Sequence, residues 1–221
     1  MQTRQLWLDL APKGGAYRRE TFVEGQSNAQ ARKALAAWKD WAGGLLALTG
    51  PSGCGKSHLT QLWAEDTGAV QYDLAHLSRT LRGCLYIEDL PTGLDETALF
   101  RLINAAAAGE VHVLLTSMHA PRQWPNTLPD LTSRLAAMPT IAIDEPDDVV
   151  LTGVLRKLFT DRQIAVNQPV IDYLLSRMER STAAALTTVE RIHAKGHDLK
   201  QNIRLPLVRT VMAEIEQEET T

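Results

Sequence analysis

Cysteine is scarce in this chain, and long apolar runs are missing. The 221 residues contain only two cysteines, Cys54 and Cys84, which indicate neither a disulfide framework nor a four-ligand zinc site. No apolar run approaches the roughly 20 residues that cross a bilayer. Arg4, Asp9 and Lys13 interrupt the N-terminal segment, where a signal peptide would need a continuous apolar core. We therefore expect reduced thiols and a cytoplasmic protein with no membrane partner.

An excess of positive charge is also missing. The formal net charge is −3, and the C-terminal segment is rich in acids, namely Glu214, Glu216, Glu218 and Glu219. A protein that grips a DNA duplex must neutralise many phosphates with Lys and Arg side chains. The charge balance therefore predicts no direct sequence-specific DNA binding by this chain alone.

What the chain does have is a glycine-rich segment with the pattern G-x-x-x-x-G-K-[ST], which His58 follows. The segment reads Gly50, Pro51, Ser52, Gly53, Cys54, Gly55, Lys56, Ser57. It lies between an apolar run at residues 45–48 and a helix-like segment at 57–65. In such a phosphate loop the backbone N–H groups face phosphate oxygens, Lys56 neutralises the outer phosphates and the Ser57 hydroxyl ligates Mg²⁺. The pattern predicts a site for ADP or ATP with Mg²⁺, and a glycine-rich surface turn is the alternative.

The rest of the first two thirds of the chain predicts an α/β fold. Short apolar runs alternate with helical or turn-rich segments, which favours a five-stranded parallel sheet with strands at residues 45–48, 69–72, 84–87, 111–115 and 140–143. Helices are predicted at 29–41, after the cap signal Ser27-Asn28, and at 96–108, after Asp95. We expect an α/β nucleotide-binding domain over residues 16–145.

The pattern changes at Pro146. Beyond it, apolar residues recur at the three-and-four spacing of amphipathic helices, within residues 150–158, 170–178, 182–192 and 206–215. We expect residues 146–221 to form a C-terminal all-helical subdomain.

Two acids follow the apolar run at 84–87. A P-loop NTPase needs a carboxylate at the tip of a neighbouring strand to hold the metal ion. Glu88 stands at the metal-associated position, where its length would shift the metal geometry, and Asp89 stands where a carboxylate polarises the attacking water. An acidic exit from a strand is the alternative.

Four segments resemble the bacterial replication initiator DnaA and occur in the same order. They are TFVEGQSNA at 21–29, GKSHL at 55–59, VLLTS at 113–117 and LTSRL at 131–135. On these motifs the chain is identified as a member of the DnaA-like AAA+ family over about residues 21–215. The resemblance implies strand order 5-1-4-3-2, a helical lid after Pro146, and an adenine pocket partly built by Phe22, Val23 and the residues up to Asn28.

The resemblance also implies that Arg134 is an arginine finger. A guanidinium stays charged and offers a planar set of donors, so it can reach the γ-phosphate bound by a neighbouring subunit. The alternative is a surface ion pair, because one arginine in a loop means little by itself.

Two further departures from the family pattern predict weak ATP hydrolysis by this chain itself. Met118 stands where the initiator has an aspartate, so a polar group near the γ-phosphate is missing unless Thr116 or Ser117 replaces it. Ala183 stands where the family has a sensing arginine. Arg180, one turn earlier on the same helix face, is the candidate replacement.

The N-terminal segment, residues 1–15, contains the pattern Q-L-x-L-x-L, formed by Gln5, Leu6, Leu8 and Leu10. It is similar to peptides that dock into the hydrophobic groove of the DNA polymerase III sliding clamp (the beta subunit). Gln5 would hydrogen-bond at the mouth of the groove while the leucines bury apolar surface. An N-terminal edge strand is the alternative.

Together these features imply a negative regulator of replication initiation. DnaA carries a DNA-recognition domain beyond its lid and this chain stops soon after its last lid helix, so we expect a regulator and not an initiator. The DNA-loaded clamp would recruit the chain, and Arg134 would complete the catalytic site of DnaA-ATP, while this chain holds ADP or ATP. An autonomous ATPase that loads a helicase and a non-catalytic adaptor are the alternatives, and homo-oligomer formation stays open.

Overall fold

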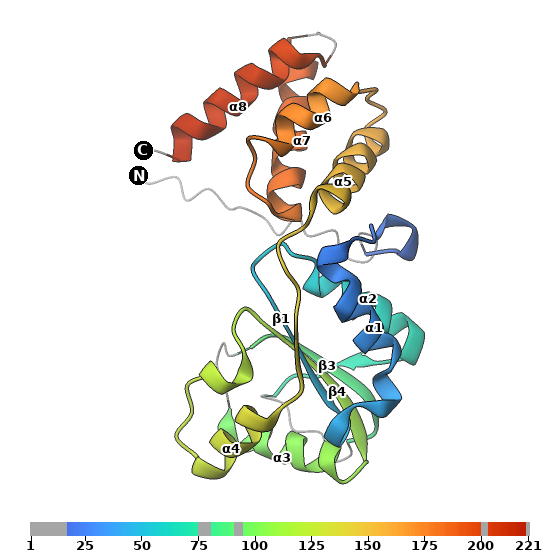
Figure 1. Ribbon diagram of the computed structural model, residues 1–221, viewed down its shortest axis with the longest axis vertical. Helices are drawn as coiled ribbons and strands as arrows, with labels where there is room; N and C mark the ends of the chain where they lie inside the picture. The colour runs from blue at the N-terminus through green and yellow to red at the C-terminus, as the bar shows by residue number, and fades with distance from the viewer. Residues whose placement is uncertain (1–16, 75–80, 91–94, 200–202, 220–221) are drawn as a thin grey trace, which may run out of the picture.

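The computed structural model describes residues 17–74, 81–90, 95–199 and 203–219. Within them a central sheet has the strands β1 (Leu45–Thr49), β2 (Val70–Gln71), β3 (Gly83–Leu90), β4 (Val111–Ser117) and β5 (Thr140–Ala142) (Figure 1). Their order is β2-β3-β4-β1-β5, and every pairing is parallel. This is the predicted order 5-1-4-3-2 read from the other edge, so the expected fold is confirmed.

Helices flank this sheet and continue beyond it. The α-helices are α1 (Gln26–Ala36), α2 (Lys56–Thr67), α3 (Glu96–Ala107), α4 (Pro129–Ala137), α5 (Asp148–Asp161), α6 (Gln168–Leu175), α7 (Thr182–Asp198) and α8 (Leu205–Glu219). Short 3₁₀ helices are η1 (Arg19–Thr21), η2 (Trp38–Asp40), η3 (Ala42–Gly44) and η4 (Pro121–Gln123). Figure 1 shows α1 and α2 on one face of the sheet and α3 and α4 on the other.

The central strand β1 shows why both faces must be covered. All five of its residues are buried. Leu45 and Ala47 pack into the cluster that includes α3 and α4, whereas Leu46 and Leu48 pack into the cluster that includes α1 and α2. Successive side chains of a strand point to opposite faces, so a run of apolar residues needs two layers of helices.

Helix α1 begins earlier than predicted. Gly25 and not Ser27 is its N-cap, and Asn28 lies inside the helix, where its side-chain oxygen accepts the N–H of Gly25 (3.2 Å). The Asn28 amide also donates to the carbonyl of Val23 (3.0 Å). The predicted cap residue therefore secures the helix start from its first turn, and the helix ends at Ala36.

Helix α4 was not predicted at all. Pro129 occupies its first turn, where its missing N–H costs nothing, and Asp130 complements the helix dipole. Leu131 and Leu135, four residues apart, are its buried contacts with the sheet domain. Arg134 consequently lies on a helix and not in a loop.

Helices α5 to α8 have an apolar core of their own, separate from the two clusters around the sheet. Its most buried members come from several helices: Leu151, Leu155, Phe159, Ile171, Leu174, Val189, Ile192 and Val208. Figure 1 shows this helical group above the end of the sheet, joined to it after β5. No helix in the described part of the chain is both long and apolar enough to cross a membrane.

Candidate nucleotide-binding site

The predicted phosphate loop joins β1 to α2. Gly53 and Gly55 have φ angles of 70° and 104°, a backbone conformation that residues other than glycine rarely adopt. These turns allow the loop to fold around the N-terminus of α2, which begins at Lys56. The resulting concave backbone and the positive end of the helix dipole suit an anionic group.

Lys56 is only 7% exposed, and its ammonium group lies within this loop. It donates hydrogen bonds to the carbonyls of Gly50 and Pro51, at 2.8 Å each. A buried ammonium needs such acceptors, because burial without partners strongly disfavours the charge. The loop's own carbonyls therefore hold one positive charge at the place where phosphate oxygens are expected.

Cys54 is a free, buried thiol in the same loop, and Cys84 is likewise free. Burial raises the pKa of Cys54, although the nearby Lys56 opposes that rise. The thiol therefore stays protonated near neutral pH and is a poor nucleophile. This agrees with a small residue placed here to fit the loop.

Glu88 and Asp89 lie at the C-terminal end of β3, beside the start of α2. Burial raises the pKa of Glu88 and the neighbouring Asp89 adds to this rise, while the nearby Ser57 hydroxyl opposes it. The carboxylate oxygen Oε1 of Glu88 is buried and has no hydrogen-bond partner among the described residues. An unsatisfied carboxylate oxygen beside a serine hydroxyl fits a divalent cation, so Ser57 and Glu88 are the pair that would hold Mg²⁺.

No cluster of three or more His, Cys, Asp or Glu side chains within the described ranges is arranged to hold a metal ion. A cation at Ser57 and Glu88 would therefore depend on nucleotide phosphates for further ligands, as Mg²⁺ usually does in nucleotide sites.

The end of β4 lies next to these acids. The Thr116 hydroxyl accepts the N–H of Asp89 (3.0 Å), and the Ser117 hydroxyl donates to the carbonyl of Leu90. Met118, at the position where the resemblance to DnaA implies an aspartate, is 56% exposed. Both hydroxyls considered as substitutes for that aspartate are thus engaged with β3.

The predicted adenine segment packs against His58 of α2. The ring of His58 lies 5.0 Å from that of Phe22, edge to face, and 5.3 Å from that of Tyr17. Burial lowers the pKa of His58, so it is neutral near pH 7. Its Nε2 lies 3.0 Å from the carbonyl of Arg18, which can only accept, so Nε2 carries the proton.

The helical lid touches the phosphate loop directly. The backbone N–H and the hydroxyl of Thr182, the first residue of α7, both donate to the carbonyl of Gly53 at 2.9 Å. A Cβ atom on Gly53 would lie 2.8 Å from the Cβ of Ser181, so only glycine permits this approach. Ser181 caps the helix by accepting the N–H of Ala184 (3.0 Å).

Arg180 does not lie on the same helix as Ala183, because α7 begins at Thr182. The Arg180 guanidinium pairs with the Asp148 carboxylate (2.8 Å) and donates to the carbonyl of Pro146 (2.9 Å). It thereby joins the start of α7 to the start of α5. Its role as a sensing arginine remains a prediction.

A second lid contact runs through Asp147, the N-cap of α5. Its carboxylate accepts the N–H groups of Val150 and Ser27, at 2.9 Å each. Burial opposes ionisation of Asp147, but these hydrogen bonds and that from Gln26 hold its pKa below its ordinary value. One carboxylate therefore secures both the start of the lid and the start of α1.

Arg134 is exposed on α4, and its guanidinium carbon lies 5.1 Å from the centre of the Phe100 ring on α3. A cation over an aromatic face is attracted by the ring quadrupole. The loop before α4 is fixed by Glu96, whose carboxylate accepts the N–H groups of Thr127 and Leu128. The Arg134 side chain is therefore accessible to solvent and is supported by Phe100 of α3.

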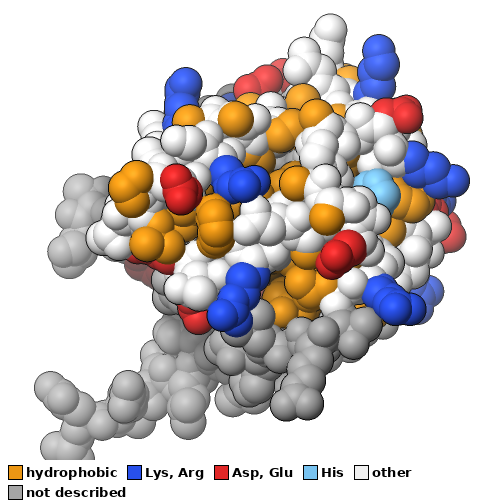
Figure 2. All heavy atoms as spheres, turned by 90° about the horizontal axis from the view of Figure 1, so that it is seen from below, with side chains coloured by type: hydrophobic (Ala, Val, Ile, Leu, Met, Phe, Trp, Pro, Cys, Tyr) orange, Lys and Arg blue, Asp and Glu red, His pale blue; other side chains and the backbone are white. Residues whose placement is uncertain are grey.

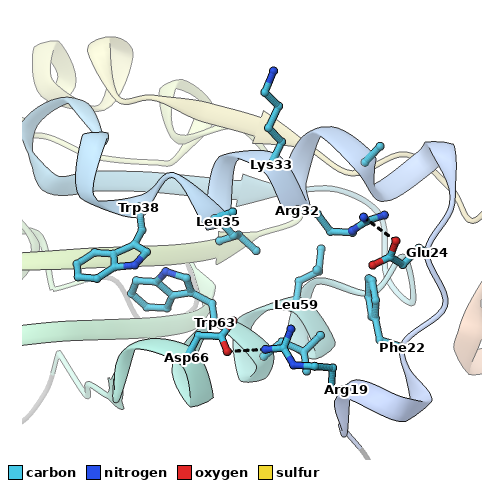
Figure 3. Close-up of a pocket in the computed structure, with 13 residues that line it drawn as sticks. Arg19, Phe22, Glu24, Arg32, Lys33, Leu35, Trp38, Leu59, Trp63 and Asp66 are labelled. Carbon is cyan, nitrogen blue, oxygen red and sulfur yellow. Dashed lines mark hydrogen bonds and ion pairs between the residues drawn. The ribbon is translucent and has the colours of Figure 1, made fainter.

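A groove of about 590 Å³ lies between α1 and α2 (Figure 3). Its floor includes Leu35, Leu59 and Trp63, and ion pairs Arg19–Asp66 and Arg32–Glu24 cross its rim. Of the predicted site residues, only Phe22 and Glu24 of the adenine segment line this groove, and none from the phosphate loop or the acids at 88 and 89 does. It is therefore separate from the phosphate loop and the acids.

One face of the molecule carries charged side chains of both signs (Figure 2). In Figure 2, basic and acidic side chains are interspersed among apolar ones, and the residues drawn in colour form no large patch of one sign. Duplex binding usually relies on a continuous basic surface.

The leader pattern Gln5, Leu6, Leu8 and Leu10 lies outside the described residues.

Comparison with known proteins agrees with this geometry. No protein-family model matches the sequence. The chromosomal replication initiator DnaA of Lactobacillus johnsonii is 23% identical over 232 residues, which cover 90% of this chain and 51% of DnaA. The chain thus spans about half the length of the curated relatives it matches.

Solved structures show the same likeness. Domain III of Thermotoga maritima DnaA superimposes with a TM-score of 0.71 at 16% identity and covers 90% of this chain and 96% of that domain. The fold is that of an AAA+ P-loop protein. A replication initiator DnaA bound to AMPPCP and single-stranded DNA gives 0.64 at 19% identity, covering 87% of this chain and 68% of that one.

The AAA+ fold is shared more widely than with initiators. The RuvB branch migration motor of Thermotoga maritima gives a TM-score of 0.66 at 17% identity, over 89% of this chain and 71% of RuvB. The fold therefore does not distinguish among AAA+ functions. Among these proteins, DnaA is also similar in sequence, at 23% identity over 90% of this chain.

Some residues around the candidate site were not predicted from the sequence. Thr182 and Ser181 touch the phosphate loop although they are 129 and 128 positions beyond Gly53. Asp147 joins two helix starts. The sequence could have indicated only their capping role, because Asp147 and Ser181 each stand just before an apolar helical pattern, where an N-cap residue is expected. Their long-range contacts had no sequence signal.

Proposed function

We propose that this chain is a nucleotide-binding regulator of replication initiation, similar to Hda, the regulatory inactivator of DnaA. The single observation that supports this most is the exposed Arg134 guanidinium on α4 of a DnaA-like AAA+ fold. An exposed guanidinium can enter the catalytic site of a second AAA+ protein, where it stabilises negative charge in the transition state. DnaA with bound ATP is the proposed partner.

In this proposal residues 16–145 bind ADP or ATP, and residues 146–221 form the lid that closes over it. The loop from Gly50 to Ser57, with Lys56 at its mouth, would hold the phosphates, and Phe22, Val23 and His58 would border the base. Mg²⁺ would be held by Ser57 and Glu88, and when bound it neutralises phosphate charge. DnaA relatives solved with AMPPCP support a nucleotide at this site.

The bound nucleotide need not be hydrolysed quickly by this chain. Met118 is exposed and carries no polar group, and the Thr116 and Ser117 hydroxyls face β3. Arg180 is held by Asp148 and the Pro146 carbonyl. These contacts support a structural role for the nucleotide, which would join the two parts of the molecule through Gly53 and Thr182.

The leader, residues 1–15, would recruit the chain to the sliding clamp. Gln5 would bind at the mouth of the clamp groove, and Leu6, Leu8 and Leu10 would bury apolar surface in it. This part of the proposal rests on the sequence pattern. Binding of a peptide of residues 1–15 to purified clamp, compared with a Gln5→Ala peptide, tests it separately.

The decisive experiment is a reconstitution of DnaA-ATP hydrolysis with DNA-loaded clamp and this protein. We expect stimulation by the wild type and a loss of about 1,000-fold in the stimulated rate for Arg134→Ala, in the range known for arginine fingers. Arg101→Ala, on the exposed side of neighbouring α3, is the matched control and should keep full stimulation. Absence of stimulation by the wild type, with both partners active, contradicts the proposal.

An autonomous ATPase that loads a helicase is the second candidate, favoured by the pairing of Ser57 with Glu88. It predicts steady ATP turnover by the purified protein without DnaA or clamp, abolished by Lys56→Ala. A non-catalytic adaptor predicts instead that Arg134→Ala keeps all activity while Gln5→Ala loses it.

A further inference from the structure

Asp89 has an unusual backbone conformation. Its φ angle is +58°, and Asp89 and Gln163 are the non-glycine residues with positive φ in the described part of the chain. The pairing of β3 with β4 is irregular at the same place, between Ile87 and Leu90. Aspartate tolerates this region better than most residues, but the conformation still needs support from its surroundings.

This irregularity changes where the two acids point. In a regular strand, Glu88 and Asp89 would point to opposite faces of the sheet. A bulge redirects a side chain, and bulges are frequent beside functional sites. Here the irregular pairing and the positive φ fall directly after Glu88, at the end of β3. The conformation of Asp89 therefore sets the direction of the second carboxylate relative to the first.

Two adjacent hydroxyl groups of β4 hold this turn. The N–H of Asp89 donates to Thr116 Oγ1 at 3.0 Å, and Ser117 Oγ donates to the carbonyl of Leu90. Thr116 and Ser117 are each 1% exposed. A buried hydroxyl beside a strained backbone N–H replaces the ladder bond that the irregular pairing cannot supply.

Ser117 has no capacity left for a ligand. Besides donating to Leu90, its oxygen accepts the indole N–H of Trp124 (3.1 Å) and the N–H of His119 (3.2 Å). A serine hydroxyl offers one donor and two acceptor positions, and all three are used. Ser117 is therefore part of the framework. Thr116 is the residue whose hydroxyl supports Asp89 directly and can be removed by substitution.

We infer that Thr116 is a positioning residue that holds Asp89 in its left-handed conformation and so sets the two-carboxylate geometry for a magnesium-bound nucleotide. This inference rests on the proposed nucleotide site. In this inference the Thr116 hydroxyl supports the backbone of β3. It does not replace the aspartate, absent at Met118, that would contact the γ-phosphate.

The test is the Mg²⁺ dependence of ADP affinity, measured by calorimetry in Mg²⁺ and in EDTA. Thr116→Val removes the hydroxyl at nearly constant shape. We expect it to reduce the affinity gain from Mg²⁺ by roughly threefold to tenfold and to leave affinity in EDTA unchanged, since one buried hydrogen bond is lost. Thr116→Ser, which keeps the hydroxyl, should restore the gain.

Asp89→Asn supplies the control for mechanism. If Thr116 acts through the Asp89 carboxylate, adding Thr116→Val to Asp89→Asn should cause no further loss of the Mg²⁺ gain. An undiminished gain in Thr116→Val, or additive losses in the double variant, overturns the inference. If the valine variant does not fold, Thr116→Ala removes the hydroxyl without a methyl group against Asp89 and takes its place.

Failure of the proposed nucleotide site gives a different result. In that case Lys56→Ala binds ADP as the wild type does, or the wild type itself does not bind, and both proposals fall. If Lys56→Ala loses binding and wild-type affinity depends on Mg²⁺ while Thr116→Val behaves as wild type, only the role of Thr116 is refuted.

Discussion

The phosphate loop and helix α4 belong to the same α/β part of the molecule but hold their cationic side chains in opposite ways. Lys56 is buried, and two carbonyls of its own loop hold the ammonium. Arg134 is exposed, and its support is the flat face of Phe100. A buried charge held by its own loop is suited to a ligand that enters that site, whereas an exposed charge on a supported helix is suited to a partner.

The two regions also differ in how they depend on the lid. The loop meets α7 through Gly53 and Thr182, so its geometry includes a contact with a distant part of the chain. The position of Arg134 depends on α3 and on the loop that Glu96 secures. Substitutions in one region should therefore leave the other intact, and four measurements can test this separation.

Among these four measurements, the largest effect is expected from Lys56→Ala. Removing the ammonium should weaken ADP binding by roughly 100-fold, because charge-assisted hydrogen bonds to phosphate are lost. Calorimetric titration measures the change, with Lys39→Ala as a control, since Lys39 lies over the Trp38 ring and away from the loop. Stimulation of a DnaA partner at saturating ADP should survive; unchanged ADP affinity would refute a phosphate-binding role for Lys56.

Gly53→Ala should disturb the contact between loop and lid. The added Cβ would lie 2.8 Å from that of Ser181 on a backbone with φ of 70°. We expect a loss of about 1–3 kcal/mol in the free energy of unfolding. Gly68→Ala is a matched control, because Gly68 has the same φ and no atom within 4 Å of an added Cβ. Equal losses in both variants would mean that the lid contact contributes nothing.

The raised pKa of Glu88 predicts a pH dependence of the Mg²⁺ effect on nucleotide affinity. Metal binding needs the ionised carboxylate, and burial stabilises the protonated form. As pH falls below this raised pKa, the Mg²⁺ effect should weaken by up to about tenfold per pH unit, starting at a higher pH than for an ordinary glutamate. Glu88→Gln should remove the dependence, and a wild-type effect that is constant with pH would exclude Glu88 as the responsible group.

The smallest effect is expected from Phe100→Leu. Loss of the cation–π contact costs about 0.5–1 kcal/mol at an exposed site, so stimulation of DnaA-ATP hydrolysis should fall roughly twofold to fivefold. Phe100→Tyr keeps a ring and should keep stimulation, and ADP affinity should not change in either variant. A loss of ADP affinity would show that the two regions are coupled after all.

Much of the fold could be predicted because it is encoded locally. The apolar runs that became β1, β3 and β4 have the length of strands covered on both faces, and Asp95 caps α3 as predicted, accepting the N–H of Ala98 (2.9 Å). Helix α4 escaped prediction because only Leu131 and Leu135 mark its short apolar face. Helix α1 begins earlier than predicted because the Asn28 side chain, inside the helix, accepts the N–H of the N-cap residue Gly25.

The candidate site was predictable only in part. The phosphate loop and the acids at 88 and 89 carry spacing that reflects their chemistry, so they could be found from the sequence. The φ of Asp89 and its bond to Thr116 could not, because that bond joins residues 27 positions apart on neighbouring strands. The pairing of Arg180 with Asp148 could not be predicted either, because it joins residues 32 positions apart in the sequence.

The sequence by itself determined which chemical groups are present and which elements carry them, because glycine pattern, apolar period and capping act over a few residues. Tertiary structure alone decided which of those groups meet: Thr182 with Gly53, Asp147 with Ser27, Thr116 with Asp89 and Arg134 with Phe100. These contacts join elements that the parallel sheet and the lid bring together from distant parts of the chain. No local propensity encodes them, since each depends on the packing of both partners at once.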